Sequence, residues 1–157
     1  MATNYGKKFE SVIKESFEKV PNTSVTRLYD STNGFLGVKT PCDFIVYHYP
    51  RQYMIECKSV HGNTLPFSNI TDNQWNGLLQ VSSIKGAIAG VLCWWIDYDI
   101  TMFLPILFLQ GEKEAGKKSV NVKDVESQIW VKLKGKKKRI FFDYDMQKFF
   151  EEFEDVW

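Results

Sequence analysis

Apolar residues at the start of the chain recur every four positions, with polar and charged residues between them. Phe9, Ile13 and Phe17 follow this spacing, which places them on one face of a helix with about 3.6 residues per turn. The pattern predicts a helix over residues 5–20. Glu10 lies about 100° from Phe9 but only about 20° from Phe17 around that helix, so it borders the apolar face without being fully solvated.

Two β-rich runs flank Pro50 and Arg51 further along the chain. Proline is favoured at the second position of a turn, so the runs predict a hairpin of residues 44–49 and 52–59. In the first half of the chain we also expect a strand at 24–29, loops at 30–39 and 59–70, and a helix that begins at the capping box of Thr71 and Gln74 and ends at about 85. Buried strands are expected at 86–96 and 100–104, around a turn at 97–99, followed by a short helix with Pro105 in its first turn. The last third is expected to form a helix at 121–127, a hairpin of 129–133 and 139–143 around Gly135, and a final helix capped by Asp143 or Asp145.

Composition indicates one globular domain spanning residues 1–157. Hydrophobic residues make up 44% of the chain and aromatic residues 15%, and there is no repeat or low-complexity linker. The longest apolar runs, 86–96 and 100–109, are shorter than the roughly 18–20 residues of a membrane span, and the N-terminus lacks the apolar run of a signal peptide. The three cysteines have no CxxC spacing, which suits a reducing cytoplasm. We therefore expect a cytoplasmic protein without a membrane partner.

The net charge of +1 neither demands nor excludes a nucleic-acid partner. Basic residues crowd positions 132–139, whereas acidic residues crowd 151–155. Considered alone, the basic run is best explained as a solvated hairpin tip.

Candidate chemistry lies on the first hairpin. Strand side chains alternate between faces, so Glu56 and Lys58 point to one side and Cys57 to the other. A turn centred on Pro50 and Arg51 sets Asp43 opposite Lys58, and all three charged groups then share a face. The two carboxylates come within about 7–8 Å at Cβ, which is close enough to bind one cation, with Mg²⁺ as the expected ion.

The energetics of this cluster also favour a bound cation. Two carboxylates about 5 Å apart repel by about 3 kcal/mol at an effective dielectric of 20, and Lys58 alone would offset that as a structural ion pair. An isolated E-x-K triplet is common by chance, and the ion pair is then the better explanation. Here, however, Asp43 follows Pro-Cys and Glu56 follows the apolar run of residues 53–55, where unpaired charge is expensive.

Four segments carry a family resemblance. GKKFESVIKES, PCDFIVY, YMIECKS and GNTLPFSNITDNQ, all within residues 5–104, are similar in order and spacing to RecU-type Holliday junction resolvases of the PD-(D/E)XK nuclease superfamily, particularly the short forms of phages of Gram-positive bacteria. The resemblance implies an α/β, restriction-endonuclease-like fold with a central mixed β-sheet flanked by helices. It implies an Mg²⁺-dependent endodeoxyribonuclease, with Mn²⁺ as a substitute, in a bacterial host cytoplasm.

The resemblance also implies residue roles. Asp43, Glu56 and the carbonyl of Cys57 are expected to bind the metal, Lys58 to be catalytic, Glu10 to support the metal site and Gln74 to lie near the active centre. Gln74 is equally well explained as the capping partner of Thr71, and a helix glutamate such as Glu10 is more often simply solvated. The expected phosphate-contacting and site-lining residues are Arg27, Lys39, Ser68 and Asn69.

The expected activity is resolution of four-way junctions by paired symmetric nicks that leave 5′ phosphates, by a homodimer with one site per subunit. Two alternatives remain open. One is another PD-(D/E)XK nuclease of restriction or repair type, and the other is a non-catalytic DNA-binding recombination accessory protein.

Overall fold

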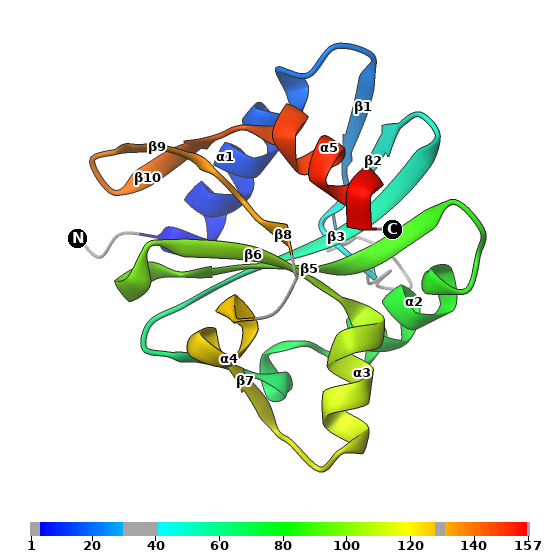
Figure 1. The fold of residues 1–157 in the computed structure, drawn as a ribbon, viewed down its shortest axis with the longest axis vertical. Coiled ribbons are helices and arrows are strands. Elements are labelled where there is room, and N and C mark those ends of the chain that lie inside the picture. The colour runs from blue at the N-terminus through cyan, green and yellow to red at the C-terminus, as the bar shows by residue number, and fades with distance from the viewer. Residues whose placement is uncertain (1–3, 30–40, 128–130, 157) are drawn as a thin grey trace, which may run out of the picture.

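The computed structural model describes residues 4–29, 41–127 and 131–156, which form a central β-sheet with helices on both faces (Figure 1). The helices are α1 (Tyr5–Glu18), α2 (Asp72–Ser82), α3 (Ile106–Glu114), α4 (Val122–Glu126) and α5 (Met146–Val156), with short 3-10 helices η1 (Phe67–Asn69) and η2 (Ile96–Tyr98). The strands are β1 (Thr23–Arg27), β2 (Phe44–His48), β3 (Arg51–Val60), β4 (Thr64–Pro66), β5 (Ala87–Trp95), β6 (Ile100–Pro105), β7 (Ser119–Asn121), β8 (Val131–Lys132), β9 (Gly135–Lys138) and β10 (Phe141–Tyr144).

The main sheet has six strands in the order β1-β2-β3-β5-β6-β8. β3 and β5 run parallel, and the other neighbours are antiparallel. The chain between β3 and β5 passes through β4 and α2, and this crossover allows the two strands to run in the same direction. The expected α/β class, with a central mixed β-sheet flanked by helices, is confirmed.

Two hydrophobic cores cover the two faces of this sheet. On one face, α1 and α5 contribute Phe9, Phe17 and Phe149, which pack with strand residues that include Ile55 and Cys57. On the other face, α2, α3 and α4 pack against alternate strand residues such as Met54 and Cys93. Cys57 therefore faces away from the α2 side, as strand alternation predicts.

The first hairpin forms as expected, but its register is shifted by two residues. Phe44 pairs with Ile55 and His48 with Arg51, so the turn is centred on Tyr49 and Pro50. The prediction that Asp43 lies opposite Lys58 is therefore wrong, because Arg51 already belongs to the ladder. A shift of two residues preserves the face on which each side chain lies.

The stretch expected as a loop over 59–70 contains further structure. β3 continues to Val60, and β4 then pairs with β7 in a small separate sheet. The expected helix after Thr71 ends at Ser82, and Pro105 precedes α3 as its N-cap rather than lying within its first turn. The short helix at 121–127 and the buried strands β5 and β6 are confirmed.

The basic segment differs from its expected form. Gly135 begins β9 and pairs with Tyr144, so the hairpin turns at Arg139 and Ile140 instead of at Gly135. A Cβ at Gly135 would lie 2.5 Å from the carbonyl oxygen of Asp143, which explains glycine there. The lysines thus run along a strand rather than a tip. Residues 30–40 and 128–130, expected as a loop and the start of a hairpin, lie outside the described part of the chain.

Two other expectations concern the last helix and the membrane. Asp145 caps α5, because its Oδ1 accepts a hydrogen bond from the backbone N–H of Lys148 at 3.1 Å. Asp143 instead pairs with Lys19 at 2.6 Å. Within the described residues, no helix is long and apolar enough to span a membrane.

Candidate active site

Asp43 begins the site immediately before β2. Its backbone N–H donates to the carbonyl of Ile55 at 3.0 Å, and its Oδ2 accepts from the backbone N–H of Cys57 at 2.8 Å. Ile55 and Cys57 flank Glu56 on β3, so these two bonds fix the Asp43 carboxylate beside Glu56. The predicted proximity of Asp43 and Glu56 is therefore present, by a register different from the predicted one.

Glu56 is the buried carboxyl of the site, with only 4% of the residue exposed. Its Oε1 accepts from Nε2 of Gln74 at 3.0 Å and lies 3.3 Å from Nζ of Lys58. Burial and the neighbouring charge of Asp43 raise the pKa of Glu56 to about 8, and Lys58 opposes that rise. The site thus holds a carboxyl that ionises only at a high cost unless more positive charge is supplied.

Gln74 has both of the roles considered for it. Its Oε1 accepts from the backbone N–H of Thr71 at 3.0 Å, and the Thr71 hydroxyl accepts from its backbone N–H at 3.2 Å, which completes the capping box. The amide end then donates to Glu56. The geometry that begins α2 therefore also aims a hydrogen-bond donor at the carboxylate.

Glu10 joins the site through Arg27. The α1 face that buries Phe9 and Phe17 leaves Glu10 at its edge, with a quarter of its side chain exposed. Arg27 donates from Nη2 to Oε2 of Glu10 at 2.8 Å and from Nη1 to Oδ1 of Asp43 at 3.0 Å. Burial, with Asp43 second, raises the pKa of Glu10, whereas Arg27 lowers it.

The guanidinium of Arg27, an expected phosphate contact, lies inside the carboxylate cluster. Its Nη1 also donates to the backbone carbonyl oxygens of Leu28 and Asp43, at 2.7 and 3.1 Å. The side chain is only 19% exposed. Arg27 therefore acts on the site itself by bridging two acids, and no feature of the sequence pattern in β1 indicated that bridge.

The donor set suits a hard divalent cation. Mg²⁺ takes oxygen ligands and uses one or two carboxylates while retaining several waters, so Asp43, Glu56 and one carbonyl form an adequate set. The raised pKa of Glu56 also fits this donor set, because a bound cation would stabilise the ionised form of the carboxyl. In the described parts of the chain, no three His, Cys, Asp or Glu side chains already converge as a metal-binding group, and Arg27 and Lys58 lie among the acids.

Cysteines border the site as neutral groups. Cys42 is buried beside the two acids, and burial, then Glu56 and Asp43, raise its thiol pKa to about 12. Burial likewise raises the pKa of the Cys57 thiol well above its usual range. Both thiols are therefore protonated near neutral pH, and Cys57 contributes through its backbone.

Other expected residues lie around the site or outside the described chain. Ser68 and Asn69 are exposed on η1, just before the helix that carries Gln74. Lys39 lies in the segment that the structure does not describe. His61 is exposed and pairs with Asp97 at 3.1 Å.

Comparisons with known proteins give a distant likeness in fold to solved structures. No family model and no curated protein matches the sequence. Among solved structures, the chain is similar to Hjc, a Holliday junction resolvase from the archaeal hyperthermophile Archaeoglobus fulgidus, with 18% sequence identity, a TM-score of 0.48, and coverage of 65% of this chain and 78% of that chain. A likeness this distant does not bear on what the site does.

Proposed function

We propose that the chain is a metal-dependent DNA endonuclease that resolves four-way junctions by paired symmetric nicks. The observation that carries the proposal is the buried Glu56 carboxyl beside Asp43, with Lys58 and the Gln74 amide both directed at one of its oxygens. A purely structural ion pair would not need a second carboxylate and an amide donor at a buried strand position. Such a group, with a pKa raised to about 8, is typical of a site built for chemistry.

Each residue has a proposed task toward a phosphodiester. Asp43, Glu56 and the Cys57 carbonyl would hold Mg²⁺, with Mn²⁺ as a substitute, and Glu10 would support them through Arg27. When bound, the ion would stabilise the phosphate and the leaving 3′ oxygen as a Lewis acid and would lower the pKa of a coordinated water. Departure of the 3′ oxygen would give a product with a 5′ phosphate. Gln74 orients the Glu56 carboxylate by donating to its Oε1.

Lys58 is the proposed catalytic lysine. Its Nζ lies 3.3 Å from Oε1 of Glu56, and its side chain is 19% exposed, so the ammonium can reach a phosphate bound over the carboxylates. Lys58 positions the attacking water, deprotonates it as the neutral amine, or stabilises the charge of the transition state as the ammonium. A pH–rate profile of Lys58→Arg distinguishes these roles, because arginine retains the charge but does not act as a base.

The junction substrate and the homodimer are supported by the sequence resemblance in residues 5–104. A resolvase makes two symmetric cuts, so two copies related by a twofold axis supply the two sites. The phage and bacterial-cytoplasm setting rests on that same resemblance. Junction specificity is thus a finer proposal than metal-dependent cleavage.

The test incubates the protein with a labelled four-way junction and a matched linear duplex in Mg²⁺, Mn²⁺ or EDTA, alongside Lys58→Ala and the control Lys148→Ala. Lys148 is exposed on α5, so the control removes the same charge outside the carboxylate cluster. Paired metal-dependent nicks on the junction, lost in Lys58→Ala only, are expected. Equal cutting of the junction and the duplex would instead support a PD-(D/E)XK nuclease without junction preference. If neither substrate is cut in any metal, only the non-catalytic DNA-binding alternative remains.

A further inference from the structure

A cavity of about 920 Å³ lies beside the start of α2, outside the carboxylate cluster. One wall is the segment from β4 through η1 to Trp75, and the other is the end of α3 with the connection to β7. β4 and β7 are paired, and the backbone N–H of Phe67 donates to the carbonyl of Lys118 at 2.9 Å. Backbone hydrogen bonds therefore join the two walls and fix their relative position.

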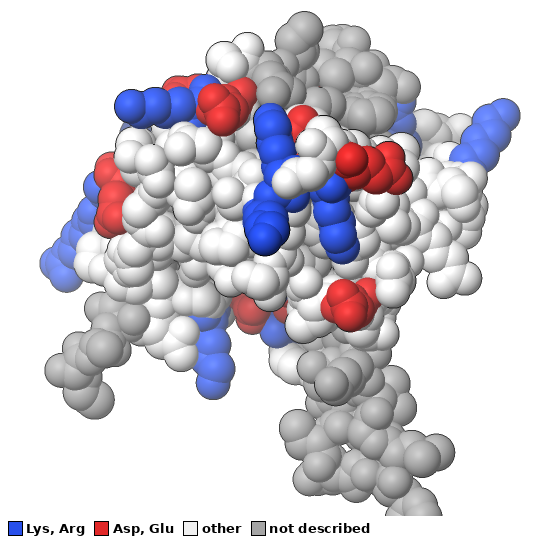
Figure 2. All heavy atoms as spheres, turned by 90° about the horizontal axis from the view of Figure 1, so that it is seen from below, with Lys and Arg blue, Asp and Glu red and all other residues white. Residues whose placement is uncertain are grey.

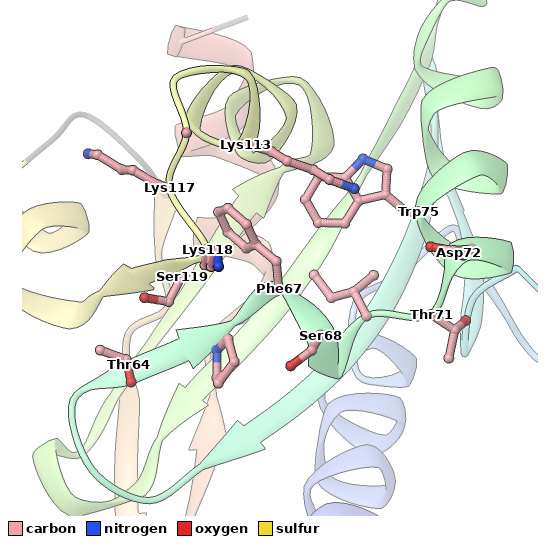
Figure 3. A pocket seen from close by; sticks show the side chains of 13 residues that line it. Thr64, Phe67, Ser68, Thr71, Asp72, Trp75, Lys113, Lys117, Lys118 and Ser119 are labelled. Carbon is pink, nitrogen blue, oxygen red and sulfur yellow. The ribbon is translucent and has the colours of Figure 1, made fainter.

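The floor of the cavity is apolar, and its rim is basic (Figure 3). The rings of Phe67 and Trp75 meet edge to face at 5.4 Å. Lys113 extends from α3 across the Trp75 ring, with its Nζ 4.6 Å from the ring centre. We refer to this cavity as the basic pocket; its lining residues are Thr64, Pro66, Phe67, Ser68, Ile70, Thr71, Asp72, Trp75, Lys113, Gly116, Lys117, Lys118 and Ser119.

The charge of the basic pocket favours an anion. Its lining has three lysines, and Asp72 is its acidic residue. Lys117 pairs with Glu112 at 2.6 Å, whereas Lys113 and Lys118 form no salt bridge with the described residues. Figure 2 shows the molecule from below the view of Figure 1, the end at which α3 connects to β7, and Lys and Arg side chains gather near the centre of that face. Two ammonium groups are thus available to a ligand.

The basic pocket is linked directly to the site. Thr71 lines it, and Gln74 bonds Thr71 at one end and Glu56 at the other. One side chain, that of Gln74, therefore connects the wall of the pocket to the Glu56 carboxyl. Apolar rings beneath a lysine rim match a nucleotide, because proteins that bind unpaired strands combine positive charge with apolar or aromatic contact to the base.

We propose that the basic pocket binds an unstacked nucleotide of the substrate strand, next to the scissile phosphate. Its base lies against the floor formed by Pro66, Phe67 and Ile70, and its flanking phosphates contact Lys113 and Lys118. This inference rests on the proposed nuclease function. It supplies a reason for junction preference if a base at the branch point is unpaired, because unstacking costs least for a base that is already single-stranded.

The test measures binding without cleavage, using the full chain in EDTA and a four-way junction that carries 2-aminopurine at the branch point. Anisotropy at several KCl concentrations gives the slope of log K against log salt. Lys113→Ala/Lys118→Ala is expected to reduce the magnitude of this slope by about 2, since each phosphate contact contributes about 0.9. The control Lys85→Ala/Lys148→Ala makes the same charge change at exposed positions outside the pocket and is expected to have little effect.

The base contact has its own readout. Wild-type protein is expected to raise 2-aminopurine fluorescence on binding, and Ser68→Trp, which blocks the exposed rim, is expected to prevent that rise. The inference is overturned if the two double-lysine variants have equal slopes of log K against log salt. It is also overturned if the pocket variant has a reduced slope but wild-type binding leaves 2-aminopurine fluorescence unchanged, or if the protein does not bind DNA. Metal-dependent cleavage unaffected by the pocket variants would reject this inference alone, whereas pocket-dependent binding without cleavage in any metal would reject the nuclease function alone.

Discussion

Glu56 is the residue whose ionisation couples the stability of the fold to the proposed chemistry. Its pKa is raised from an ordinary 4.5 to about 8 by burial and by Asp43, so the folded protein holds a proton that the unfolded chain has released. Each pKa unit corresponds to roughly 1.4 kcal/mol. Without metal, folding stability therefore falls as pH rises from about 4.5 to about 8.

Thermal melts between pH 4.5 and 8.5 in EDTA test this prediction. Glu56→Gln, which carries no ionisable group, should lose that decline, and added Mg²⁺ should restore wild-type stability at pH 8 because a bound cation favours the carboxylate. A wild-type melting temperature that climbs over this range would show that Glu56 is charged in the fold.

Arg27 is the second residue with a specific expected effect, because its guanidinium bridges Glu10 and Asp43. Arg27→Met removes both bonds and leaves two partly buried carboxylates facing one another, at an expected cost of roughly 1–3 kcal/mol. Mg²⁺ should recover more stability in this variant than in wild type. Chemical denaturation with and without Mg²⁺ measures both effects, and an equal response to Mg²⁺ in the two proteins would argue against a cation site between these acids.

At the scale of elements, the first turn of α2 combines a structural and a chemical role. Thr71→Ala removes the N-cap hydroxyl and should cost about 1 kcal/mol of stability while the Gln74 amide still reaches Glu56. Gln74→Ala removes the capping partner and also the donor to Glu56, so it should lower the cleavage rate as well. Urea denaturation and single-turnover cleavage separate the two effects, and the idea is refuted if Gln74→Ala loses stability alone.

The hairpin and the basic segment show which parts of the fold could be read from sequence. The alternation that puts Glu56 and Lys58 on one face is local to a strand, so it was predictable without knowing the pairing. The register depends on which residues form the turn, and Tyr49 and Pro50 form it rather than Pro50 and Arg51. The pairing of Gly135 with Tyr144 likewise depends on close approach to β10, which composition does not encode.

The site was partly predictable for the same reason. Strand parity and the predicted hairpin indicated that Asp43 and Glu56 lie close together, and the family resemblance implied that Gln74 lies near them. The Arg27 bridge joins α1, β1 and the residue before β2, and its formation requires the packing of Phe9 and Phe17 on the sheet. No local spacing carries that information.

At the scale of the whole molecule, two symmetric cuts require two sites held in fixed relation. The proposed assembly is a homodimer, so sedimentation equilibrium on the junction should give, after the mass of the DNA is subtracted, a protein mass near twice the 18.3 kDa of one chain. A protein that stays monomeric on the junction and nicks only one strand would contradict paired resolution. It would leave the metal-dependent chemistry of a single site intact.

The most direct test of the central claim is the single-turnover rate of junction cleavage as a function of Mg²⁺ concentration, for wild type, Glu56→Gln and Glu18→Gln. Glu18 is an exposed acid at the end of α1, so its variant makes the same chemical change away from the site. The account predicts saturable Mg²⁺-dependent cleavage by wild type and Glu18→Gln, and a loss on the order of 10²–10³-fold in Glu56→Gln. Cleavage by Glu56→Gln at the wild-type rate, or cleavage that persists in EDTA, would contradict it.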